Sequence, residues 1–244
     1  MIGIDELMHK YWNTSFRSIP LSLKNPKSFP DPTKLFEQAD GNIPPHFFRG
    51  EKTLQRYSCT DKMVKDTLLM DLSATIIIWH VATDICYLPL STTTTDERVI
   101  TCKVISDYMM YLVATKPSMV SEEDNFWFDS LSRKLRKELQ QSTISLKDEA
   151  TVYQQFFSEI SSEEDESAPS KVILKHAMRI EEVLREMAEK WDIMMSVWLE
   201  MMHYAAMRCP HLSHLQALSQ GSEILSMYWL LASYNIYENS NIED

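Results

Sequence analysis

The amino-acid sequence predicts an all-α protein: a multi-helix bundle with one long central helix and an extended, proline-containing N-terminal arm. Two observations support this fold class. The 244 residues include only 4 glycines, and residues 51–220 contain none, whereas an average composition would give about 17. Phosphate-binding loops and the turns of β-hairpins depend on glycine. In addition, apolar residues recur three and four positions apart along most of the chain, which is the spacing of one face of a helix.

The N-terminal arm is defined by its prolines. Residues 1–46 hold more than half of the chain's 10 prolines. Proline lacks a backbone donor and disfavours helix at the preceding residue. The arm also contains tryptophan, phenylalanine and leucine, so we expect it to lie along the surface of the protein. We therefore divide the chain into the arm (1–46), a helical body (47–237) and a polar tail (238–244).

The first helices of the body are delimited by prolines and capping residues. A short helix is predicted over residues 47–57. The next helix ends at Pro89, and its consecutive isoleucines 76–78 indicate burial on more than one side. Thr95 is predicted to cap the following helix, which Pro117 ends. The apolar face of the helix before Pro89 is formed by Leu69, Leu72, Ile76, Trp79, Thr83 and Cys86.

In the middle of the chain the sequence predicts two amphipathic helices, one from Asp124 and one over residues 146–160. An acidic loop over residues 161–167 follows them. In this loop Ser161 and Ser162 each precede an acidic residue by three positions. They are candidate phosphorylation sites for a kinase that selects acidic sequences. The simpler interpretation is a hydrophilic loop.

The long central helix is predicted from Pro169 to Arg208. Proline suits the first turn of a helix, and an apolar seam then alternates steps of four and three over ten positions. About 40 helical residues would span about 60 Å, so one end projects or the helix breaks. The seam fits either an intramolecular bundle or an intermolecular coiled coil. Trp191 and Trp198 are bulky for a two-stranded coil, which favours the bundle.

Two shorter helices complete the predicted body. One covers residues 211–220, after Pro210. Gly221 breaks it, and Ser222 is placed to cap the last helix.

Net charge and cysteine content narrow the expected cellular location and the expected classes of partner. The formal net charge of -11 repels phosphate backbones, so nucleic acid is not expected as a partner. The 4 cysteines lie far apart, and we read them as reduced core residues of a cytoplasmic protein, with nucleus and mitochondrion left open. No transmembrane segment is expected, because the most apolar window, 68–87, is interrupted by charged and polar residues.

Several polar residues have the spacing of metal ligands. His80 and Asp84 are four apart on one helix, and Glu200 and His203 are three apart on another. Glu-x-x-His is half of the motif that di-iron helical bundles use, and such a site needs two copies and further carboxylates. We favour structural hydrogen-bonded pairs and expect no metal or other cofactor. The set comprises His80, Asp84, Asp107, Glu200, His203 and Glu223.

Methionines are concentrated in the long helix. Methionine fills irregular gaps in a core and also forms adaptable binding surfaces. Core packing is the favoured role. If one face of this stretch is exposed, it becomes a surface for a partner. The residues concerned are Met187, Met194, Met195, Met201 and Met202.

Five strings in the sequence resemble the C-terminal domain of a plant family of unknown function that is expanded in grasses. They begin at Trp79, Ile105, Trp198, Tyr204 and Leu218, and read WHVATDICY, ISDYMMYL, WLE, YAA and LSQGSEIL. Together they span about residues 47–235. Longer members of the family carry several N-terminal membrane helices, which this chain lacks, so the resemblance implies no membrane location. It also implies no catalytic residue.

These observations favour a non-enzymatic helical module of plants that acts in protein–protein interaction or regulation. The resemblance implies a soluble, truncated relative of a membrane protein family, with full-length relatives or another protein as partner and a role in defence or in a toxin–antidote pair. A homo-oligomer is compatible with this function. Two alternatives remain: a metal-dependent helical enzyme using Glu200 and His203 with His80 and Asp84, and a peripheral membrane protein that binds through the aromatic arm.

Overall fold

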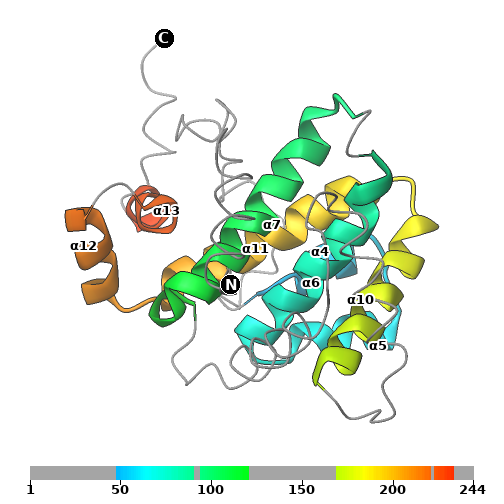
Figure 1. The fold of residues 1–244 in the computed structure, drawn as a ribbon, viewed down its shortest axis with the longest axis horizontal. Helices are drawn as coiled ribbons and strands as arrows, with labels where there is room; N and C mark the ends of the chain where they lie inside the picture. Colours follow the sequence, from blue (N-terminus) through cyan, green and yellow to red (C-terminus); the bar gives the residue numbers. More distant parts are fainter. Residues whose placement is uncertain (1–47, 91–93, 121–168, 221–222, 234–244) are drawn as a thin grey trace, which may run out of the picture.

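The computed structural model describes residues 48–90, 94–120, 169–220 and 223–233, and these form a bundle of eight α-helices with no strand (Figure 1). The all-α fold class is therefore confirmed. The arm, the helices predicted from Asp124 and over 146–160, the acidic loop with Ser161 and Ser162, and the polar tail lie outside the described residues.

The helices lie in four described ranges of the chain, and residues 121–168 separate the first four from the last four. They are α4 (Glu51–Arg56), α5 (Lys62–Leu68), α6 (Leu72–Tyr87), α7 (Glu97–Thr115), α10 (Pro169–Arg185), α11 (Lys190–Arg208), α12 (His211–Gln220) and α13 (Ile224–Ser233). Two short 3₁₀ helices, η4 (Leu88–Leu90) and η5 (Pro117–Met119), follow α6 and α7. Proline marks both of these ends, as predicted.

Aspartates begin three of the helices. Asp61 accepts a hydrogen bond from the amide of Val64 at 3.0 Å, and Asp71 accepts one from Ser73 at 2.9 Å. The cap of α7 is Asp96, whose carboxylate accepts from the Arg98 amide at 2.9 Å. The prediction that Thr95 caps this helix is therefore wrong by one residue. Threonine and aspartate are both effective caps, and the carboxylate takes the position here.

Helices α6, α7 and α11 form the centre of the packing (Figure 1). Helix α6 contacts α10 and α7, and α7 contacts α11, while α13 packs on α11 and α12 packs on α13. The indole N–H groups of two fully buried tryptophans are satisfied: Trp79 donates to the Thr67 hydroxyl at 3.0 Å and Trp198 to the Thr83 hydroxyl at 3.1 Å. Burying such rings with their N–H paired stabilises one specific packing of the core.

The three consecutive isoleucines of α6 are all buried, which confirms the predicted burial on more than one side. Ile76, Ile77 and Ile78 are at most 1% exposed. Within the described ranges, one stretch, Leu72–Leu90, is long and apolar enough to cross a membrane by length and composition, and 72% of it is buried inside the fold. A helix at the centre of a bundle can be as apolar as a membrane-spanning helix, because other helices cover most of its surface.

The predicted single helix from Pro169 to Arg208 is two helices. Helix α10 ends at Arg185 and α11 begins at Lys190, with turns between them in which the Met187 amide donates to Leu184 and the Lys190 amide to Met187. Neither proline nor glycine occurs in this junction, so packing causes the break. Helix α10 lies on α6 and α5, whereas α11 lies on α7, α4 and α13.

The apolar seam survives this break inside the core. Ile173, Ala177, Ile180 and Leu184 are buried in the first half, and Met194, Trp198, Met201 and Ala205 in the second. The seam thus packs against other helices of the same chain, which is the intramolecular bundle that the sequence favoured over a coiled coil.

Candidate functional site

The most concentrated polar site is a buried charge cluster between α6 and α7. His80 and Asp84 face it from α6, and Lys103 and Asp107 face it from α7; all four residues are at most 8% exposed. The ammonium of Lys103 lies 2.9 Å from Asp84 Oδ1 and contacts Asp107 Oδ1. His80 Nε2 lies 3.5 Å from Asp84 Oδ2, and its Nδ1 is 3.0 Å from the Ser106 hydroxyl.

Burial and ion pairing shift the pKa values of the groups in this cluster in opposite directions. Burial raises the pKa of Asp107, although Lys103 and His80 favour its ionised form. For Lys103 burial would lower the pKa, but Asp84 and Asp107 outweigh that effect and raise the pKa above its ordinary value. The ammonium therefore stays charged at neutral pH and neutralises one of two buried carboxylates.

The cluster contains three groups of the kind that bind metal ions. Ligand atoms of His80, Asp84 and Asp107 lie within 4.8 Å of one another. Lys103, however, already places a positive charge on both carboxylates. A divalent cation would have to displace that ammonium or bind beside it, and like charges in a buried site repel strongly. The arrangement resembles a structural ion pair more than a metal site.

The rest of the proposed metal constellation lies elsewhere. Glu200 accepts hydrogen bonds from the amides of Gly50 at 2.8 Å and Thr53 at 2.9 Å, and from the Thr53 hydroxyl at 2.6 Å. It thus caps the first turn of α4 from α11. Burial raises the pKa of Glu200, while the hydrogen bonds from Thr53 and Gly50 oppose the rise.

His203 and Glu223 join α13 to the central helices. His203 Nδ1 lies 3.2 Å from the Tyr228 hydroxyl. Glu223 accepts a hydrogen bond from the Tyr108 hydroxyl at 2.7 Å and contacts the Lys116 ammonium. The Tyr108 hydroxyl in turn accepts from the Leu225 amide at 2.8 Å. Of the six polar residues predicted from the sequence, His80, Asp84 and Asp107 therefore meet in one cluster. Glu200, His203 and Glu223 each have other partners, so the di-iron arrangement with Glu200 and His203 beside His80 and Asp84 is not assembled.

The methionine surface is also not formed. Met194, Met201 and Met202 are fully buried, and Met187 and Met195 are partly buried against the core. These side chains pack in and against the core, which is the role that the sequence favoured, and they do not form the exposed partner surface that was its alternative. The four cysteines, Cys59, Cys86, Cys102 and Cys209, are free and buried, which agrees with their predicted role as core residues.

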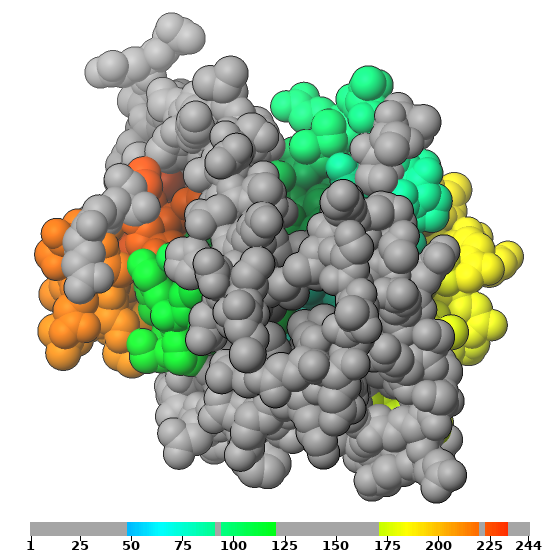
Figure 2. Space-filling view, viewed as in Figure 1, coloured from blue at the N-terminus to red at the C-terminus, as the bar shows by residue number. Residues whose placement is uncertain are grey.

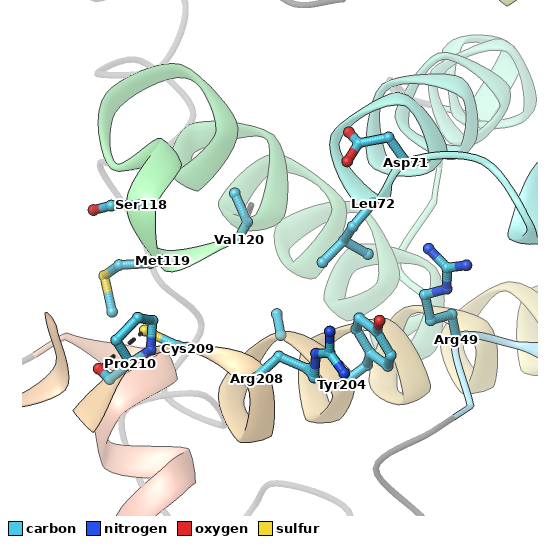
Figure 3. Close-up of a pocket in the computed structure, with 11 residues that line it drawn as sticks. Arg49, Asp71, Leu72, Ser118, Met119, Val120, Tyr204, Arg208, Cys209 and Pro210 are labelled. Atoms are coloured by element: carbon cyan, nitrogen blue, oxygen red, sulfur yellow. Dashed lines mark hydrogen bonds between the residues drawn. The ribbon is translucent and has the colours of Figure 1, made fainter. Parts of the chain in front are cut away.

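A pocket that the sequence did not predict opens between the start of α6, η5 and the end of α11 (Figure 3). Its volume is about 180 Å³. Figure 3 shows Arg49, Tyr204 and Arg208 in a row along one side, with Leu72 and Val120 across from them. Tyr204 and Arg208 share a face of α11 because they are four residues apart. Nothing in the sequence connects them to Arg49, which lies before α4.

Comparison with protein families finds a match to part of the chain. Residues 184–235 match the model of a protein family of unknown function, DUF594. A domain of unknown function is therefore found at the end of α10 through α13, within the longer span over which the sequence resembles a family of unknown function. No curated protein and no solved structure matches the chain. The matched domain includes Glu200, His203, Tyr204 and Arg208.

Proposed function

We propose that the protein is a non-enzymatic interaction module with a regulatory role, and that α12 carries its contact with a protein partner. The observation behind this proposal is a pair of exposed leucines in the matched domain. Leu212 is 65% exposed and Leu215 is 58% exposed. They are three residues apart, so they lie on one face of α12. Helix α12 forms the outer edge of the molecule at one end (Figures 1 and 2).

The polar residues support a structural role for the body. His80, Asp84, Asp107, Glu200 and Glu223 each hold helices together through the contacts described above. Groups engaged in this way stabilise the bundle on which α12 is presented. We propose a longer relative with the same domain, or another protein, as the partner, and the cytoplasm of a plant cell as the place of contact.

The leucine pair contributes to the free energy of binding in proportion to the apolar area that a partner covers. Burying one leucine side chain is worth about 1.5–3 kcal/mol. The other large exposed apolar side chains in the described ranges, Leu69 and Met178, lie on other elements, at the end of α5 and on α10. Isolated residues of this kind are common on surfaces without a partner, so they serve as matched controls.

The experiment compares two double variants of the full chain by affinity purification from plant tissue. Leu212→Lys with Leu215→Lys should lose the proteins that the unmodified chain recovers, whereas Leu69→Lys with Met178→Lys should retain them. Recovery of the same proteins by both variants, or reproducible recovery of none together with a monomeric state in sedimentation, would overturn the proposal. Stoichiometric iron, manganese or zinc in the purified protein would favour the metal-dependent alternative instead.

A further inference from the structure

We propose that the pocket between α6, η5 and α11 binds a carboxylate that is attached to a small apolar group. The ligand is either a small organic acid or the C-terminal end of a peptide, since both present this chemistry. Neither Leu212 nor Leu215 lines this pocket, so the failure of one proposal leaves the other standing.

The basic side of the pocket consists of two arginines held by one tyrosine. The guanidinium carbon of Arg49 lies 5.2 Å from the centre of the Tyr204 ring, and that of Arg208 lies 5.6 Å from the same centre (Figure 3). Arg49 also donates a hydrogen bond to the Met70 carbonyl at 2.8 Å. These contacts restrict both guanidiniums, which lowers the entropy that they lose when an anion binds.

Neither guanidinium has a carboxylate partner among the residues that the structure describes. By contrast, Arg98 pairs with Asp96 and Asp192, Arg179 with Asp61 and Glu182, and Arg185 with Glu181. In a chain of net charge -11, two neighbouring arginines without such a partner form a local positive site. A guanidinium has five donors in a planar fork that matches a carboxylate.

One acidic residue, Asp71, also lines the pocket. Its carboxylate accepts hydrogen bonds from the Ser73 amide at 2.9 Å and the Ala74 amide at 3.4 Å, at the positive end of α6. The carboxylate keeps its negative charge in this contact, with the amides of the helix start beside it. The two arginines that line the pocket outnumber this one carboxylate, so the charged side chains of the lining are positive on balance.

The opposite wall of the pocket is apolar and fixed in place. Leu72, Met119 and Val120 are at most 6% exposed. Cys209, at the end of α11, also lines the pocket, and burial raises the pKa of its thiol to about 11, so it carries no charge at neutral pH. A volume of about 180 Å³ equals about six water molecules at about 30 Å³ each. This space suits a short alkyl chain or one leucine-sized side chain next to a carboxylate.

The test measures binding to the full chain by isothermal titration calorimetry with four probes. Hexanoate and hexanamide have the same alkyl chain and differ in charge. Acetyl-alanyl-leucine with a free carboxylate and the same peptide with a C-terminal amide form the second pair. We expect the acids to bind with dissociation constants in the millimolar range or below and the amides not to bind measurably. Binding of hexanoate alone identifies a small acid, and tighter binding of the peptide acid identifies a peptide end.

Variants link the binding to the pocket. Arg208→Gln should weaken binding of either acid about tenfold, because it removes one charged pair of donors from an exposed side chain. Arg185→Gln, at an exposed arginine of α10, is the control and should leave the affinity unchanged. Equal binding of acid and amide, equal affinity in Arg208→Gln and the unmodified chain, or no binding by any acid would each overturn the proposal.

Discussion

Lys103 of α7 forms an ion pair with Asp84 of α6, and its ammonium lies 2.9 Å from a carboxylate oxygen of Asp84. Asp107, one turn along α7, contacts the same ammonium. Both aspartates are buried in the core of the bundle. The contact between α6 and α7 therefore depends on a charged group in a place where apolar side chains would usually meet.

Removing the ammonium should destabilise the protein strongly. Lys103→Met leaves two buried carboxylates without their cation, and breaking a buried ion pair from one side costs about 3–5 kcal/mol. Urea unfolding followed by tryptophan fluorescence measures this loss. In the control, Lys103→Met is combined with Asp84→Asn and Asp107→Asn, which removes the unpaired charges and should recover much of the stability. A single variant that loses less than about 1 kcal/mol would contradict the assigned role.

Stability should fall in alkali because of the same lysine. The pKa of Lys103 is raised above its ordinary 10.5 in the folded chain. Above pH 10.5 the unfolded chain therefore releases this proton while the folded chain retains it, and the free energy of unfolding decreases as pH rises. Tyr108 acts in the same direction, since burial and Glu223 raise its pKa well above 10.0. Unfolding measured from pH 9 upward should show a shallower decline in Lys103→Met and in Tyr108→Phe, and an unchanged decline in both would refute this assignment.

His214 should make the protein less stable in mild acid. Its Nε2 donates to the Ala206 carbonyl at 2.9 Å, and its Nδ1 accepts from the Ser226 hydroxyl at 2.9 Å. Burial lowers the pKa of His214 below 6.5. Below that pH the unfolded chain takes up a proton that the folded chain resists, so stability decreases as pH falls. The free energy of unfolding should differ less between neutral pH and about pH 5 in His214→Gln than in the unmodified chain. An equal difference in both proteins would exclude His214 as the cause.

Gly50 should not tolerate a side chain. Its φ is +131°, and a Cβ atom there would lie 2.9 Å from Val197 Cγ1. Gly50→Ala therefore combines backbone strain with overpacking, which together cost about 2–4 kcal/mol. Thermal unfolding checks the loss. Adding Val197→Ala should restore part of it by removing the steric clash, and a double variant no better than additive would show that strain alone is responsible.

The sequence predicted most helices because their limits are local. Proline ended α6 and α7 near the predicted positions, and Pro169 began α10. The break after Arg185 was not predicted as a definite feature, because no residue of the junction disfavours helix. It arises from packing, as α10 and α11 bind different neighbours.

Candidate-site residues were predictable only within one helix. His80 and Asp84 could be paired from their spacing, since helical geometry fixes side chains four apart. Lys103 was overlooked, although its spacing to Asp107 is the same and could have indicated it. Contacts between helices, such as that of Glu200 with Gly50, depend on packing that a single sequence does not specify. The same applies to the pocket formed by Arg49 with Tyr204 and Arg208.

The cap on α4 has a consequence for when this helix can fold during synthesis of the chain. The carboxylate that caps α4 belongs to Glu200, 150 residues after Gly50. At about 5–20 residues per second, the ribosome needs about 8–30 s to synthesise that interval. During this time the first turn of α4 lacks its acceptor, and Leu54 lacks the core in which it is later fully buried. Helix α4 thus completes its folding only after α11 has emerged, and until then the apolar side chain of Leu54 is available to a chaperone that binds exposed apolar residues.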